Sequence, residues 1–277
     1  MSFLDRNVLV DGVRLAYRDR GEGEPVVFVH GTPSWSHEWR HVVPHVEAAG
    51  HRVITYDLLG YGDSERPLDR DTSVGAQTDL LLALLDELGV EHPTLITHDI
   101  GGAIGQRVAA LHPGTIRRLM LIDTVSYDSW PSETWQEIIR TRLDSYASMT
   151  ADQFEAMMTR QLTMTVADEA VMTGDELRAF LAPHRTALGR TSFFEHQVRH
   201  YDSRWTEEIA DRLEKIDVPV RIVWGRADRW QPVSYAERLA ADIPGASLVV
   251  VDGAGHFLME DDPARLTREV LDFLASP

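Results

Sequence analysis

Short apolar runs alternate with amphipathic stretches along the first half of the chain, and the alternation returns near its end. The runs that predict β-strands are residues 8–10, 13–17, 25–29, 52–56, 93–97, 118–122, 218–224 and 247–251. Helical periodicity marks residues 74–88, 101–111 and 263–274. Strands that alternate with helices pair in parallel, so this pattern predicts an α/β fold with a mostly parallel central sheet flanked by helices. The Asp11-Gly12 pair predicts a tight turn that joins the first two runs as a hairpin.

The alternation stops near Ser126. From residue 127 to residue 212 the sequence is helical, aromatic and rich in methionine, with no convincing strand. The simplest interpretation is a helical cap inserted into an α/β core after the sixth strand. We therefore predict a core domain of residues 1–126 and 213–277 and a helical cap, or lid, domain of residues 127–212.

The composition narrows the class of protein. The chain has 277 residues, of which 43% are hydrophobic, enough for the core of one large domain with an insertion. The formal net charge of −17 argues against binding to nucleic acid or to an anionic membrane, because both need a basic surface. The sequence contains no cysteine, no signal-peptide pattern in its first residues and no apolar run near the ~18 residues of a membrane span. These features predict a cytoplasmic protein without disulfides.

The segment Thr97-His-Asp-Ile-Gly-Gly102 follows one predicted strand and leads into a predicted helix. A strand, a tight turn and a helix form the setting of a nucleophile elbow, usually written G-x-S-x-G. Asp99 stands where serine usually stands. A carboxylate nucleophile attacks carbon and leaves an ester on the enzyme, which suits opening an epoxide or displacing a halide better than ordinary ester hydrolysis.

Two further polar residues follow predicted strands. Asp228 comes after the run at 218–224, and His256 comes after the run at 247–251. Functional groups collect at the carboxyl ends of the strands in open parallel sheets. The order of nucleophile, acid and histidine along the chain is that of an α/β-hydrolase triad. We therefore predict that Asp99, Asp228 and His256 form a catalytic triad.

Four more segments carry a resemblance that covers nearly the whole chain. They are His30-Gly-Thr-Pro33, Trp39-Arg40, Asp57-Leu-Leu-Gly-Tyr-Gly-Asp-Ser64 and Asp252-Gly-Ala-Gly-His256. Together with the elbow, they resemble the α/β-hydrolase superfamily, and specifically its branch of epoxide hydrolases and haloalkane dehalogenases with an aspartate nucleophile. Thr97 departs from the family pattern, which prefers a small residue, usually glycine, because the turn at the nucleophile leaves little room.

The resemblance implies a two-step mechanism that needs no cofactor and no metal. Asp99 attacks the substrate carbon and forms an alkyl-enzyme ester. His256, oriented by Asp228, then takes a proton from the water that attacks the carbonyl carbon of Asp99. The backbone amides of Thr32 and Ile100 would hold the resulting oxyanion, and the amide of Thr32 matters more in this role than its side chain.

The acid of the triad has one rival. Asp123 directly follows the predicted strand at 118–122. Some members of the family keep their acid at that position, so Asp123 is the alternative to Asp228, which we prefer.

The candidate reactions differ in the hydrogen-bond or proton donor that their leaving group needs. A departing halide needs N–H donors, and dehalogenases of this branch usually carry Trp directly after the nucleophile and often Asn in the H-G-x-P loop. This chain has Ile100 and Thr32 at those positions. An epoxide oxygen needs a proton, which epoxide hydrolases supply from two cap residues, normally two tyrosines. The ring-opening candidates are Tyr146 and Tyr201, with His196 and His200 as stand-ins.

An apolar pocket would complete the site, and Trp35, Trp130 and Tyr127 are candidates for its wall. Our first choice is an epoxide hydrolase that uses water to open a small apolar epoxide to a diol. The alternatives are a haloalkane dehalogenase-like hydrolase, an ester, lactone or C–C hydrolase of the same fold, and a non-enzymatic binding protein of this fold. A homodimer is compatible with the sequence.

Overall fold

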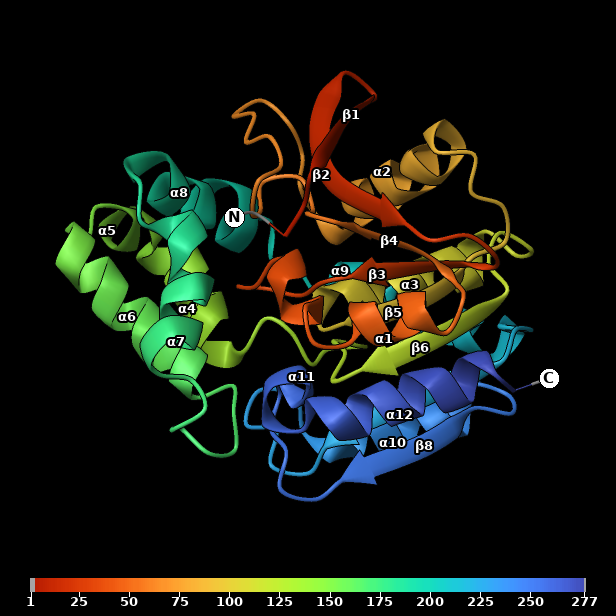
Figure 1. The fold of residues 1–277 in the computed structure, drawn as a ribbon. Helices are drawn as coiled ribbons and strands as arrows, with labels where there is room; N and C mark the ends of the chain where they lie inside the picture. The colour runs from red at the N-terminus through yellow and green to blue at the C-terminus, as the bar shows by residue number, and fades with distance from the viewer. Residues whose placement is uncertain (1–2, 277) are drawn as a thin grey trace.

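The computed structural model describes residues 3–276, with an eight-stranded sheet between two layers of helices and a cap beside it (Figure 1). The strand order is β1-β2-β4-β3-β5-β6-β7-β8. The strands are β1 Arg6–Val10, β2 Val13–Arg20, β3 Pro25–Val29, β4 Arg52–Tyr56, β5 Thr94–His98, β6 Arg118–Ile122, β7 Val220–Gly225 and β8 Ser247–Val251. The pairs β1–β2 and β2–β4 are antiparallel and all other neighbouring strands are parallel. The α/β fold with a mostly parallel sheet is therefore confirmed.

Both faces of the central strands are buried. In β3, Val27 and Val29 pack into the apolar cluster on one side of the sheet, and Val26 and Phe28 pack into the cluster on the other side. All four side chains are fully buried. A strand covered on both faces needs a nearly continuous apolar run, which explains why these strands were visible in the sequence. The predicted hairpin is also confirmed, because Asp11 and Gly12 both have positive φ, at 48° and 78°, between β1 and β2.

Helices cover both faces of the sheet (Figure 1). One face carries α2 Val74–Glu87, α3 Ile100–Leu111 and α10 Val233–Asp242, and the other carries α1 Val43–Ala48, α11 Leu258–Asp261 and α12 Pro263–Leu274. Side chains cap two of these helices. Ser73 accepts a hydrogen bond from the Ala76 amide at the start of α2, and Asp262 accepts one from the Arg265 amide at the start of α12. The three predicted helices are confirmed, whereas α1, α10 and α11 were not predicted.

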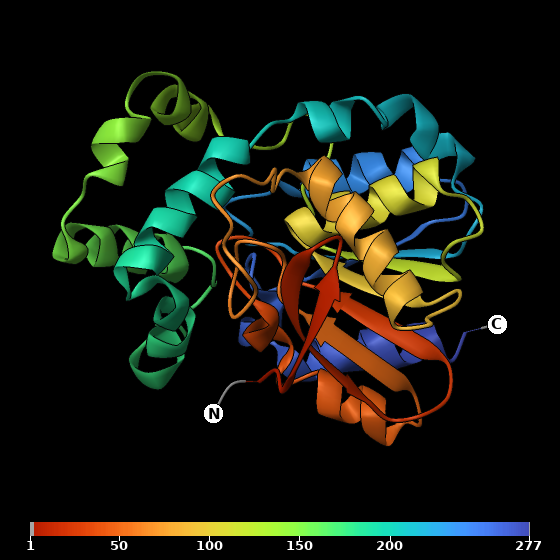
Figure 2. The same cartoon turned by 90° about the horizontal axis from the view of Figure 1, so that it is seen from above.

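The cap lies beside the carboxyl ends of the strands, between β6 and β7 in sequence (Figure 2). Its helices are α4 Glu133–Thr141, α5 Leu143–Ala147, α6 Ala151–Thr163, α7 Gly174–Leu181 and α8 Ala187–Ser192, followed by a π-helical turn at Phe193–Gln197 and a 3-10 turn at Val198–His200. Aromatic side chains hold them together, since the ring of Phe154 lies 5.5 Å from Phe193 and 5.8 Å from Phe194. None of the helices in residues 3–276 is both long enough and apolar enough to cross a membrane.

The end of the segment predicted as cap packs on the core. Helix α9 (Arg204–Glu207) and the 3-10 turn Ala210–Lys215 contact α3. Ile209 and Leu213 belong to the same buried cluster as the sheet and α3. These residues therefore anchor the chain on the core before it enters β7.

Candidate active site

The nucleophile elbow lies between β5 and α3. Asp99 has backbone angles of φ 51° and ψ −118°, which residues with a side chain rarely adopt. Neighbouring backbone holds the turn, because the Asp99 carbonyl accepts hydrogen bonds from Gly102 N at 3.0 Å and from Val125 N at 3.2 Å. A Cβ on Gly101 would collide with the Val29 carbonyl, so glycine is needed for α3 to approach β3 this closely. The Asp99 side chain thereby faces a cavity under the cap.

Thr97 fits this elbow although the family prefers a smaller residue. Its hydroxyl donates to the Met120 carbonyl on β6 at 2.7 Å. Its methyl group points at Gly105 of α3, where an added Cβ would lie only 3.1 Å away. The missing side chain of Gly105 therefore supplies the space that Thr97 takes, and the departure from the family pattern leaves the elbow intact.

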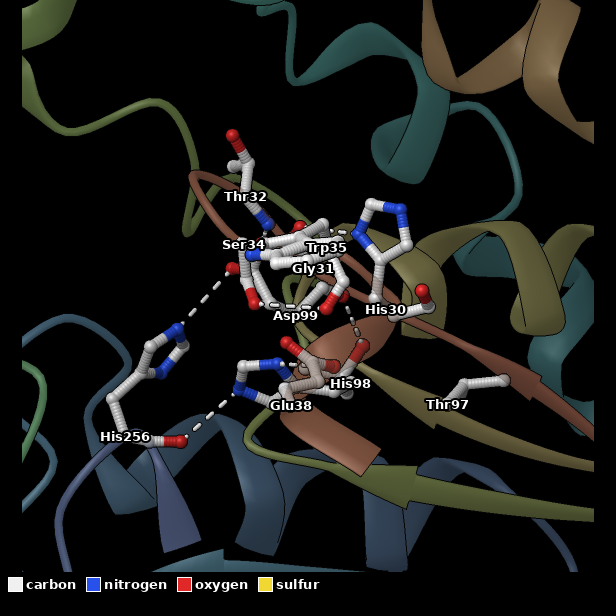
Figure 3. A network of polar contacts seen from close by, with 12 residues as sticks. His30, Gly31, Thr32, Ser34, Trp35, Glu38, Thr97, His98, Asp99 and His256 are labelled. Carbon is white, nitrogen blue, oxygen red and sulfur yellow. Dashed lines mark hydrogen bonds and ion pairs between the residues drawn. The ribbon is translucent and has the colours of Figure 1, made fainter. Parts of the chain in front are cut away.

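The two oxygens of Asp99 have different surroundings (Figure 3). Oδ1 accepts a hydrogen bond from the Thr32 amide at 2.8 Å. Oδ2 lies 3.5 Å from Nε2 of His256. Among the described residues, no hydrogen bond joins the Ile100 amide to Asp99, although this amide begins the first turn of α3 directly beside it. One of the two predicted oxyanion donors is therefore engaged in this structure, and Oδ2 is the oxygen free to attack.

His256 and Asp228 complete the arrangement. Nδ1 of His256 lies 2.8 Å from Oδ2 of Asp228, so this nitrogen carries the proton that the carboxylate accepts. Asp228 is itself fixed, because its Oδ1 accepts backbone hydrogen bonds from Trp230 at 2.7 Å and Gln231 at 2.9 Å. Nε2 of His256 is left to face Asp99 and the cavity. The structure thus brings together the three residues predicted as a triad.

Asp123 occupies a different position from the one its alternative role requires. It is fully buried, and its Oδ1 accepts a hydrogen bond from the Gly225 amide at 2.8 Å. Burial and the charge of Asp228 raise the pKa of Asp123 well above its usual range. The raised pKa favours protonated Asp123, which adds no second negative charge beside Asp228. The structure places Asp228, and not Asp123, against Nδ1 of His256.

The charges of the triad shift one another's pKa values. Burial raises the pKa of Asp99, but the hydrogen bond and charge of His256 and the charge of His98 more than offset it, so the pKa lies below its usual range. Burial lowers the pKa of His256, but Asp228 and Asp99 together raise it well above its usual range. His256 therefore favours its protonated form while both carboxylates are charged.

A second buried pair lies behind the nucleophile and was not predicted from the sequence (Figure 3). Nδ1 of His98 lies 3.3 Å from Oε1 of Glu38, and both side chains are completely buried. Nε2 of His98 lies 3.1 Å from the backbone carbonyl of His256. A carbonyl can only accept, so this nitrogen carries a proton and holds the loop of His256 in place. No motif in the sequence marked Glu38 as a buried residue.

We expect Glu38→Leu to lower the free energy of unfolding by about 3 kcal/mol, because removing one partner of a buried pair leaves the other unpaired. Urea denaturation followed by circular dichroism would measure the loss. Glu38→Gln is the matched control, since its amide can still donate to Nδ1 of His98 and should cost less. Equal losses in the two variants would mean that packing, and not the pairing with His98, accounts for the effect.

A cavity lies above the triad and beneath the cap. Its wall combines Trp130 and Trp135 from the entry to the cap with Tyr201 from its end. The Tyr201 hydroxyl lies 2.8 Å from Oγ1 of Thr32. Tyr201 and Trp130 thus lie where their predicted roles require, whereas other lining residues were not predicted: Pro33, Ser129, Ser132, Gln161, Thr165, Trp230 and Gln231. Trp230 and Gln231 follow Asp228 in the same loop. This closeness in sequence to a predicted catalytic residue could have marked them as lining residues.

Tyr146 does not reach this cavity, which corrects its predicted ring-opening role. It lines an outer pocket with Met149 and Met157. Trp135 lines both spaces, and its ring lies 6.3 Å from that of Tyr146. The short helix α5 (Leu143–Ala147) therefore places this phenol on the far side of Trp135 from Asp99.

Trp35 and Tyr127 are also corrected as pocket residues, because both pack elsewhere. The Trp35 ring stacks on His37 with 5.1 Å between ring centroids. The Tyr127 hydroxyl donates to Asp242 at 2.7 Å. Neither residue lines the cavity.

The two histidine stand-ins are likewise occupied. Nδ1 of His196 lies 3.0 Å from the Ser192 hydroxyl, and its Nε2 lies 2.7 Å from the Pro67 carbonyl. His200 pairs with Asp71 at 3.1 Å. Both residues tie the cap to the loop after β4, so they are not available as proton donors in the cavity.

Comparison with known proteins gives the family. A family model described as the alpha/beta hydrolase fold matches residues 24–263. The chain belongs to the α/β-hydrolase fold family. It is therefore a hydrolase of this fold, as the resemblance implied at the level of the superfamily.

Individual relatives span nearly the whole chain. The chain is 28% identical to a 2-hydroxymuconate semialdehyde hydrolase from Pseudomonas sp. (strain CF600), over 98% of this chain and 94% of that protein. It is 31% identical to a cis-3-alkyl-4-alkyloxetan-2-one decarboxylase from Shewanella oneidensis, over 98% of this chain and 87% of that protein. An α/β-hydrolase fold protein from Burkholderia ambifaria shares the structure with a TM-score of 0.91 and 35% identity, covering 98% of both chains. These relatives support the superfamily and not the epoxide hydrolase branch in particular.

Proposed function

We propose that this hydrolase opens an apolar epoxide to a diol through an ester of Asp99. The observation that carries the proposal is the carboxylate at the elbow, held between the Thr32 amide and the His256 imidazole, with the Tyr201 phenol in the same cavity. A carboxylate at this position can form an ester with an electrophilic carbon. The aromatic wall of Trp130 and Trp135 suits an apolar substrate.

In the first step, Oδ2 of Asp99 attacks a ring carbon and the C–O bond of the epoxide breaks. The departing oxygen needs a proton, and the Tyr201 hydroxyl is the phenol that lines the cavity. Burial, together with Tyr61 and Asp99, raises the pKa of Tyr201 well above its usual range, although the hydrogen bond with Thr32 opposes this shift. Tyr201 therefore keeps its proton at neutral pH until an alkoxide develops beside it.

In the second step, the charge of Asp99 has disappeared into the ester. Because that charge helped to raise the pKa of His256, its loss lowers this pKa and favours the neutral imidazole, which can accept a proton from the attacking water. The Thr32 amide already holds Oδ1, which becomes the oxyanion when water attacks the Asp99 carbonyl carbon. Such a donor typically contributes about 3 kcal/mol to the stability of the transition state.

A strained lactone is the second candidate substrate. The relative from Shewanella oneidensis is named for an oxetan-2-one, a four-membered lactone ring. Opening that ring at its C–O carbon releases a carboxylate, which needs no proton donor, so a cavity with one phenol would suffice. Halide displacement is less favoured, since neither Ile100 nor Thr32 provides a side-chain N–H donor beside Asp99.

Oxygen-18 labelling tests the proposal. We expect a single turnover of 1,2-epoxyhexane by excess enzyme in labelled water to place the label in the Asp99 carboxylate and to leave the diol unlabelled. The reason is that water attacks the carbonyl carbon of the ester and not the epoxide. Mass spectrometry of the peptide that contains Asp99, and of the diol, would measure both products.

The control is a second turnover by the same labelled enzyme in ordinary water, which should pass the label on to the diol. Label in the diol during the first turnover would contradict an ester intermediate. Turnover of a 3,4-dialkyl-oxetan-2-one without turnover of any epoxide would favour the lactone.

A further inference from the structure

The cavity contains a single phenol. Of the residues that line it within the described chain, Asp99, His256 and Tyr201 are the ones that titrate. Asp99 is the nucleophile, and His256 lies on the side of the attacking oxygen, away from the oxygen that leaves in an in-line displacement. Tyr201 must then protonate the leaving oxygen alone, without the second phenol that Tyr146 was predicted to supply.

Tyr201 has a hydrogen-bond partner that can take the place of a second phenol. Its hydroxyl lies 2.8 Å from Oγ1 of Thr32, and Oγ1 of Thr32 lies 3.4 Å from Oε1 of Gln197. Gln197 is held by its other side-chain atom, since its Nε2 donates to the Gly60 carbonyl at 3.4 Å. The Thr32 hydroxyl thus lies between the Tyr201 phenol and the side-chain oxygen of Gln197.

The Thr32 hydroxyl has only one proton, which it can donate either to Oε1 of Gln197 or to the hydroxyl oxygen of Tyr201. When Thr32 donates to Oε1 of Gln197, it accepts from Tyr201, and the phenol proton is engaged. When Thr32 turns its proton toward Tyr201, the phenol proton is free to point at the substrate. Rotation about one C–O bond of Thr32 therefore couples the phenol to the leaving oxygen.

We propose that the side chain of Thr32 is a positioning residue for ring opening, which turns its hydroxyl to Tyr201 as Tyr201 gives up its proton. This inference rests on the proposed function. The O–H bond of Tyr201 breaks, an O–H bond forms on the opened substrate, and the phenolate accepts the proton of Thr32 as a charge-assisted hydrogen bond.

The proton balance closes over both steps. Ester formation consumes the proton of Tyr201, and once the charge of Asp99 is lost, protonated His256 gives up a proton that returns to the Tyr201 phenolate. Neutral His256 then collects the proton released when water attacks the ester, which restores the resting enzyme, and the sum is epoxide plus water giving diol. A phenolate left unpaired in this buried setting would be costly, so the Thr32 hydroxyl stabilises the state between the two steps.

Substitution of Thr32 separates this role from that of its amide. In a His256→Gln parent, which stalls at the ester, we expect Thr32→Val to slow ester formation from 1,2-epoxyhexane about 10- to 100-fold, the range for a hydrogen bond to a charged group. Thr32→Ser retains the hydroxyl and should stay within about threefold of the parent, by the same reasoning. Intact-protein mass spectrometry against time would follow the adduct.

Equal rates for Thr32→Val and its parent would overturn the inference, as would a Thr32→Ser variant as slow as Thr32→Val. A parent that forms no epoxide adduct at all would instead refute the proposed function, so the two failures are distinct.

Discussion

Asp99→Ala is expected to abolish ester formation and to lower epoxide turnover by roughly 10⁴-fold or more, the scale seen when a covalent nucleophile is removed. Asp99 is the side chain at the strained elbow, and its Oδ2 faces the cavity without a backbone partner. Alanine keeps the Cβ and the turn but offers no oxygen to attack carbon. Rates of diol formation, measured by gas chromatography for wild type and variant, would give the ratio.

The matched control is Asp99→Asn, which preserves the size and polarity of the side chain and its acceptor for the Thr32 amide. It should be nearly as inactive as Asp99→Ala, because an amide is a poor nucleophile. Thermal denaturation of both variants would show that the fold is retained. Substantial epoxide turnover by Asp99→Ala would mean that water attacks the substrate directly, and the carboxylate would then have no covalent role.

The sheet and the triad could be predicted because local rules determine them. Val26 to Val29 alternate between two buried layers, which forces a continuous apolar run in the sequence. Asp99, Asp228 and His256 each follow such a run, so the topology of a parallel sheet alone brings them to one edge. Their mutual distances then follow from the fold, without any knowledge of how the cap packs.

The cap residues could not be assigned because their direction depends on how short helices dock. Tyr146 and Tyr201 are both aromatic residues in helical sequence, and nothing local distinguishes them. Tyr201 follows the 3-10 turn Val198–His200 and faces Thr32, whereas Tyr146 on α5 lies beyond Trp135. Tertiary packing of the cap, and not periodicity, decides which phenol reaches Asp99.

Partners of the site residues were missed for a related reason. Glu38 lies in a short 3-10 turn among polar residues, where sequence alone suggests an exposed position. Its burial follows from the approach of His98, which is known only once β5 and the loop after β3 are placed side by side. Long-range contacts of this kind leave no signal in either segment.

Asp228→Asn is expected to slow hydrolysis of the ester by roughly 10³- to 10⁴-fold, the effect known for the acid of a serine-protease triad. Asparagine can accept from Nδ1 of His256, but it can also present its amide and favour the wrong tautomer, in which Nε2 is protonated and cannot act as a base. Ester formation needs no base and should change much less. Burst kinetics would separate the two steps, with adduct accumulating in the variant.

Asp123→Asn is the matched control within the same cluster. Asp123 is expected to be protonated, and asparagine is likewise neutral and of the same size, while its oxygen still accepts from the Gly225 amide. Its effect should therefore stay small, within about threefold for a neutral hydrogen bond that is replaced by another. Accumulation of ester in Asp123→Asn, with normal hydrolysis in Asp228→Asn, would transfer the acid role to the sixth strand. The contact of 2.8 Å between Asp228 and His256 argues for the opposite outcome, because only a carboxylate on Nδ1 can keep Nε2 free for the water.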